Sequence, residues 1–123
     1  MYALMLSRTF KARHFLVGND WGPENEPHAH AYRVEARLAA ETLDRHGYVI
    51  DLEALEKHLD RAVEHFRDRL LNEMPEFRGI NPSIEHLSRR LFDLMVSGMD
   101  RHRLASIEIR IWESDDAWAS YRE

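Results

Sequence analysis

The sequence contains no cysteine. Without a thiol, these residues can form no disulfide, no thiolate nucleophile and no cysteine-ligated metal site. Any bound metal must therefore be held by histidine, aspartate or glutamate side chains. The absence of cysteine also agrees with a reducing compartment, and we expect a cytoplasmic protein.

Long apolar runs and an excess of positive charge are missing as well. No apolar stretch approaches the roughly 20 residues that a membrane helix needs, and the N-terminus lacks the features of a signal peptide. The formal charge is −5, with acidic and basic residues interleaved, so no basic stripe is available for a phosphate backbone. We expect neither a membrane nor a nucleic acid as partner. With 123 residues, of which 44% are hydrophobic, the chain is predicted to form one domain, residues 1–123.

Histidine is abundant, and its placement suggests a metal site. His28 and His30 are two residues apart, so in a β-strand both side chains project to the same side, about 7 Å apart. His14 lies in an earlier strand-like stretch, which an antiparallel pairing would bring beside them. Three imidazole ligands leave a fourth tetrahedral position open, as in catalytic zinc sites. The competing interpretation is a chance spacing of two solvated strand histidines, since the chain has eight histidines.

The spacing of apolar residues predicts an α+β fold. Alternation indicates strands, whereas apolar residues three and four apart indicate amphipathic helices, which Asp51 and Ser83 can cap. Both faces of the first strand carry apolar residues, so we expect it to be covered on both sides or to lie in a subunit contact. The expected elements are strands over residues 1–16 and 28–42 joined by a loop at 17–27, helices over 51–69 and 83–97, and strands over 107–111 and 117–121. This order, ββααββ, predicts a four-stranded antiparallel sheet with two helices on one face.

Four short motifs occur in a familiar order along the chain. They are Phe10-Lys11-Ala12-Arg13-His14, Pro27-His28-Ala29-His30-Ala31-Tyr32, Asn81-Pro82-Ser83-Ile84-Glu85 and Trp112-Glu113-Ser114. Together they resemble the 6-pyruvoyltetrahydropterin synthase family, which includes the 6-carboxytetrahydropterin synthases. The resemblance spans nearly the whole chain and implies the tunnelling fold, in which subunits join their sheets into a barrel. It also implies zinc on His14, His28 and His30, a homotrimer or homohexamer, and a reduced pterin, dihydroneopterin or its triphosphate, as small-molecule ligand.

The resemblance also assigns two residues to binding of the pterin ring. Glu113 matches the family glutamate that accepts hydrogen bonds from the N–H edge of the ring. Such a carboxylate would suit any ligand with a 2-amino-4-oxo pyrimidine edge. Ser83 falls where the family has threonine and is a second candidate ring contact. Capping of the second helix is an equally good explanation for Ser83.

The chain departs from the family at the proton-transfer residues. The family base is a cysteine four residues before the first histidine of the His-x-His motif, and Glu24 stands there in this chain. A carboxylate can accept a proton, and Glu26 is an alternative candidate for the same role. Both glutamates could also be ordinary solvated loop residues.

The family's Asp-His pair is missing as well. Counting back from Leu71-Asn72 places either Arg67-Asp68 or Asp68-Arg69 at its positions, and neither register supplies a histidine. Arginine cannot act as a base near neutral pH. Asp68 remains a candidate proton-transfer group, with His65 expected about one helical turn away on the same face.

Three functions are therefore in competition. The first is a zinc-dependent lyase or hydrolase acting on a reduced pterin with Glu24 as base. The second is a pterin- or purine-binding homologue that has kept metal and ring recognition but lost the standard chemistry. The third is an oligomeric scaffold whose histidines bind metal without a substrate. Glu113 argues against a scaffold, which would not need a ring anchor.

Overall fold

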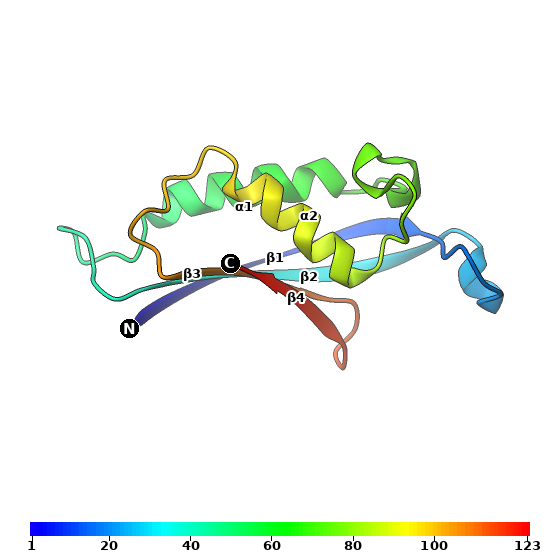
Figure 1. Cartoon of the computed structure of the whole chain (residues 1–123), viewed down its shortest axis with the longest axis horizontal. Helices are drawn as coiled ribbons and strands as arrows, with labels where there is room; N and C mark the ends of the chain where they lie inside the picture. Colours follow the sequence, from blue (N-terminus) through cyan, green and yellow to red (C-terminus); the bar gives the residue numbers. More distant parts are fainter.

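A computed structural model describes residues 1–123 and shows four antiparallel strands with two helices over one face (Figure 1). The strands are β1 (Tyr2–His14), β2 (His28–Ala40), β3 (Ser106–Trp112) and β4 (Trp118–Arg122). The helices are α1 (Leu52–Phe66) and α2 (Ile84–Val96), with short 3-10 helices η1 (Gly22–Asn25), η2 (Leu71–Glu73) and η3 (Pro75–Phe77). The strands lie in the sheet in chain order, β1-β2-β3-β4. The predicted fold class and element order are confirmed.

The hairpin of β1 and β2 sets the position of the histidines. Its pairing runs from Tyr2 opposite Ala40 to His14 opposite His28. Because side chains alternate along a strand, this register places the histidines on the same face as the buried Phe10 and Tyr32. The end of this hairpin extends beyond the helices, at the right of Figure 1. The histidine side chains therefore lie on the helix-covered face of the sheet, where the strands end.

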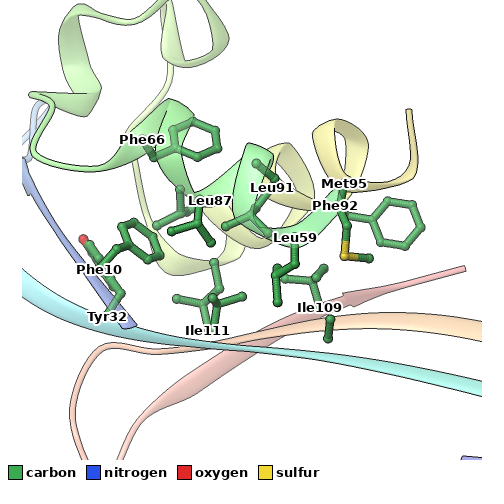
Figure 2. Packing of buried hydrophobic residues seen from close by; sticks show 14 of the residues in the cluster. Phe10, Tyr32, Leu59, Phe66, Leu87, Leu91, Phe92, Met95, Ile109 and Ile111 are labelled. Atoms are coloured by element: carbon green, nitrogen blue, oxygen red, sulfur yellow. The ribbon is translucent and has the colours of Figure 1, made fainter. Parts of the chain in front are cut away.

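A core of 23 buried residues fills the space between the sheet and the helices (Figure 2). In α1 the buried positions recur at spacings of three and four, from Leu55 to Phe66, as the sequence pattern predicts. Asp51 and Ser83 cap the two helices, since their side chains accept hydrogen bonds from the backbone N–H groups of Glu53 and His86. The long β1–β2 hairpin is thus anchored to a packed core on one face.

Helix α1 ends at Phe66, earlier than the predicted end near residue 69. Asp68 has a positive φ of 59°, which a helix interior does not allow. Its backbone N–H donates to the Lys11 carbonyl at 2.7 Å, and the Arg13 N–H donates to the Arg69 carbonyl at 2.9 Å. The chain therefore leaves the helix to pair with the edge of β1, which apolar spacing alone does not reveal.

The strand limits differ from the prediction by smaller amounts. The first strand ends at His14 and the second at Ala40, each two residues before the expected limit. The last strand, Trp118–Arg122, is shifted by one residue from the predicted range. On the outer face of β1, Met5 is 47% exposed in the single chain. The first strand was expected either to be covered on both sides or to lie in a subunit contact. Covering of both sides within the single chain is wrong. Neither helix is long and apolar enough to cross a membrane.

Candidate functional site

His14, His28 and His30 come together at the loop end of the β1–β2 hairpin. One nitrogen from each lies within 4.8 Å of the others, and the ring centroids are 4.6, 4.8 and 4.9 Å apart. His14 is buried and the other two are half-buried. The predicted clustering of these three side chains is confirmed. Metal binding by them stays a prediction.

Backbone carbonyls orient two of the three imidazole rings, those of His14 and His28. The Nδ1 atom of His14 lies 2.9 Å from the Pro82 carbonyl oxygen, and the Nδ1 atom of His28 lies 2.8 Å from the Glu26 carbonyl oxygen. A carbonyl only accepts, so each Nδ1 carries a proton, and in the neutral form of each ring Nε2 is the nitrogen with the lone pair. Histidines that bind a metal are commonly oriented in this way, because the ring nitrogen that does not bind the metal donates to a carbonyl or carboxylate. Residue types gave no signal for these contacts, because the accepting atoms belong to the backbone.

Two asparagines continue the pairing of β1 past His14. The Asn72 side chain accepts from the Phe15 N–H and donates to the Phe15 carbonyl, both at 2.9 Å. Asn81 does the same for Val17, at 2.9 and 3.2 Å. These bonds hold the segment that carries Pro82 against the end of β1. The asparagines that helped to define the sequence motifs therefore have a structural role beside the histidines.

The residues present fit a three-histidine zinc site. Imidazole nitrogen is a common zinc ligand in its neutral form. Burial lowers the pKa of His30, which favours that form, although the charge of Glu113 raises the same pKa. Ala29 replaces the middle glycine of the family motif and lies in β2 opposite Arg13, without the positive φ that would require glycine. The backbone therefore tolerates alanine at this position.

Glu113 lies beside the histidines, just past the end of β3. Its Oε1 atom is 3.1 Å from the Nε2 atom of His30, although the geometry is not that of a hydrogen bond. The preceding side chain, Trp112, points to the outer face, where its Nε1–H donates to Glu35. The alternation of β3 thus directs Glu113 to the histidine side of the sheet. A carboxylate able to recognise N–H groups therefore lies next to the candidate metal ligands.

Of the two loop glutamates, only Glu24 contributes to the electrostatic environment of His30. It lies in η1, where its backbone carbonyl accepts from the Leu16 N–H at 2.8 Å. Its carboxylate is close enough to raise the pKa of His30, against the larger lowering caused by burial. Glu26 contributes its backbone carbonyl to His28 instead. The electrostatic effect on His30 therefore comes from Glu24 and not from Glu26, and the role of either glutamate as base stays a prediction.

The structure does not bring Asp68 to the histidine cluster within one chain. Asp68 is exposed and lines a shallow hollow at the edge of β1 with Thr9 and Ala31. The expected sharing of a helix face between Asp68 and His65 is wrong, because the helix ends before Asp68. His65 instead forms a hydrogen bond with Glu76, with 2.5 Å between Nε2 and Oε1. The catalytic role of Asp68 stays a prediction.

Ser83 has a confirmed capping role, and its ring contact stays a prediction. Its Oγ accepts from the His86 N–H at 3.1 Å.

Substituting Ser83 by alanine is expected to destabilise the fold by about 0.5–2 kcal/mol, measured by urea unfolding. Asp51→Ala removes the equivalent cap of the other helix and serves as the matched control. A loss of pterin binding confined to Ser83→Ala would support the ring contact, whereas unchanged binding in both variants would contradict it.

The comparisons with known proteins agree with this arrangement. The family model for 6-pyruvoyl tetrahydropterin synthase matches residues 3–123, and the chain belongs to that family. It is 23% identical over 117 residues to 6-carboxy-5,6,7,8-tetrahydropterin synthase of Bacillus subtilis (strain 168), covering 90% of this chain and 78% of the relative.

Two solved structures show the same fold. The 6-pyruvoyl tetrahydropterin synthase of Caenorhabditis elegans has a TM-score of 0.84 at 21% identity, covering 100% of this chain and 97% of that one. A catalytic residue mutant of the Plasmodium vivax synthase, with glutamate replaced by alanine, has a TM-score of 0.82 at 16% identity, covering 99% and 97%. These likenesses confirm the tunnelling fold expected from the sequence.

Proposed function

We propose that this protein binds zinc through His14, His28 and His30 and acts on a reduced pterin, dihydroneopterin or its triphosphate. The observation that carries the proposal is the 3.1 Å approach of Glu113 to His30. It joins the candidate ring anchor and the candidate metal ligands in one site. A scaffold protein has no need for that combination.

The proposed chemistry divides among a few groups. Bound zinc would polarise the hydroxyl groups of the substrate side chain as a Lewis acid. Glu113 would accept hydrogen bonds from the N–H edge of the ring and so fix its orientation. Glu24 would accept the proton that a cysteine accepts in other members of the family. In the Plasmodium vivax synthase, the glutamate replaced in the mutant structure is described as a catalytic residue. That description supports a carboxylate in this role.

Binding of a dihydropterin tests this proposal most directly. Zinc-loaded protein titrated with dihydroneopterin is expected to bind it, and Glu113→Gln is expected to weaken binding by roughly 1.5–3 kcal/mol, the range for a hydrogen bond to a charged group. Glu108→Gln is the matched control, because Glu108 lies on β3, the strand that leads to Glu113, and pairs with Arg110 on the opposite face. Equal affinity of Glu113→Gln and the unsubstituted protein would contradict the ring-anchor role.

A second candidate function is binding without the standard chemistry. The missing Asp-His pair favours it, since the only acid at those positions, Asp68, is exposed at the edge of β1. In the enzyme hypothesis, Asp68 can act as a proton-transfer group only at a subunit boundary, because that edge faces outward from the chain. The two candidates differ in turnover and share the same prediction for binding.

We also propose that the protein is a homotrimer or homohexamer. β1 and β4 are the edge strands of the sheet, and the segment after α1 covers the β1 edge only near residues 11–13. Beside the N-terminal part of β1 lies a largely apolar hollow of about 630 Å³, lined in part by Tyr2, Tyr48 and Leu52. These three side chains are 52%, 51% and 44% exposed. An open edge next to exposed apolar surface is suited to a subunit contact.

Sedimentation velocity at micromolar concentration checks this proposal. The expected mass is that of three or six chains, because closing the sheets into a barrel removes the exposed edges. Substituting Tyr48 by aspartate would place a charge in the hollow and is expected to shift the distribution toward smaller species. A stable monomer of the unsubstituted protein would contradict the proposal.

A further inference from the structure

Tyr32 places a hydroxyl group in the protein interior without a hydrogen-bond partner. The residue is fully buried, and its oxygen neither donates nor accepts. Its ring packs against Phe10 at 5.4 Å and His30 at 5.6 Å between centroids. Figure 2 shows the hydroxyl at one margin of the core, beside Phe10. Buried tyrosine hydroxyls usually find a partner, so packing alone does not explain why this position carries tyrosine and not phenylalanine.

Glu113 is a candidate hydrogen-bond partner for the Tyr32 hydroxyl. Arg33 pairs with Trp112 across β2 and β3, so Tyr32 and Glu113 are the next residues at this end of the two strands. Both side chains lie on the helix-covered face. A tyrosine hydroxyl is an O–H donor near neutral pH, and this one has no partner in the core. It is therefore available to donate a hydrogen bond to a neighbouring carboxylate.

We propose that Tyr32 is a positioning residue whose hydroxyl donates a hydrogen bond to the Glu113 carboxylate when Glu113 turns from His30 to a bound ring. This inference rests on the proposed function of Glu113 as ring anchor. A carboxylate has about four lone-pair sites, so it can accept two N–H groups of the ring and one O–H together. The bond from Tyr32 would fix the plane of the carboxylate, and the ring would then meet a preorganised acceptor.

This role predicts an unusual combination of effects for Tyr32→Phe. The substitution keeps the buried ring and removes a hydroxyl that has no partner in the ligand-free chain. Stability is therefore expected to stay the same or rise, because no hydrogen bond is lost and a buried polar group is removed. Affinity for a dihydropterin is expected to fall. A tyrosine with a purely structural role would show loss of stability with unchanged affinity.

The test uses the full chain loaded with zinc and dihydroneopterin as the probe. Four proteins are titrated: unsubstituted, Tyr32→Phe, Glu113→Gln and the double variant. Tyr32→Phe is expected to raise Kd about 5–10-fold, to leave zinc content unchanged and to keep or raise the melting temperature. In the Glu113→Gln background the same change is expected to raise Kd less than about 2-fold, because its acceptor is altered. Tyr121→Phe is the matched control, because it also removes a tyrosine hydroxyl, one that donates to Glu123 near the C-terminal end of β4.

The outcomes separate this inference from the proposed function. If the unsubstituted protein binds dihydroneopterin and Tyr32→Phe binds it equally well, the inference is overturned and the proposed function stands. An equal loss of affinity with and without Glu113 would overturn the route through the carboxylate. Unfolding or zinc loss in Tyr32→Phe would show a structural role and would also overturn it. If the unsubstituted protein does not bind the pterin, both proposals fall.

Discussion

Replacing His28 by alanine is expected to abolish zinc binding. The unsubstituted, zinc-supplemented protein should hold about one zinc per chain, with metal–nitrogen distances near ~2.1 Å. Losing one of three protein ligands should weaken binding by more than about 100-fold, since loss of an outer contact alone costs 10–100-fold. Metal analysis after desalting measures the stoichiometry directly. The expected result is a fall from about one zinc per chain to almost none.

The control for this experiment is another histidine of the same chain. His46 is exposed in the turn before α1, away from the hairpin end that carries the other three histidines. His46→Ala should therefore retain its zinc. Zinc bound equally by His28→Ala and His46→Ala would refute the assignment of His28. A lack of zinc in the unsubstituted protein would refute the metal site as a whole.

Strand alternation made the histidine cluster predictable from sequence. His28 and His30 share a face by spacing alone, and only an antiparallel register was needed to add His14. The two amphipathic helices were equally visible, because their buried residues recur at regular spacing. These features depend on the pattern of side chains along the chain. A regular pattern is what a single sequence displays most clearly.

The parts that the sequence did not reveal depend on backbone atoms and on local departures from regular structure. The carbonyls of Glu26 and Pro82 orient two imidazoles, and a carbonyl is present at every residue. The end of α1 at Phe66 follows from pairing of the next residues with the edge of β1, a contact between distant segments. The partnerless hydroxyl of Tyr32 likewise appears only when the core is assembled.

The structure also indicates how rigid the parts of the site are. The three histidines stand on or at the ends of paired strands, where sheet hydrogen bonds fix the backbone. Glu24 stands on a connecting loop, yet Asn25 ties that loop down by donating to the carbonyls of Leu16 and Asn19 at 2.9 and 3.0 Å. A loop held in this way keeps Glu24 in place, and a general base must lie within hydrogen-bond reach of the proton that it takes.

Replacing Glu24 by alanine is expected to reduce turnover of a dihydropterin by at least about 100-fold, the usual scale for losing a general acid or base. Consumption of dihydroneopterin and of its triphosphate, followed by chromatography, measures turnover without assuming a product. Zinc content and pterin affinity should change little, because Glu24 is outside the histidine cluster and is not the ring anchor. Glu26→Ala is the matched control, since the carbonyl that binds His28 remains in that variant.

The unsubstituted protein has its own expected result in the same assay. Formation of 6-pyruvoyl- or 6-carboxytetrahydropterin requires protons to be taken from and returned to specific carbons, which the family assigns to a cysteine and an aspartate-backed histidine. Neither the thiol nor that histidine is present in this chain. We therefore expect these products to be absent or to form at least about 100-fold more slowly than with an enzyme that carries both groups. Full-rate conversion of the triphosphate that persists in Glu24→Ala would show that another group is the base.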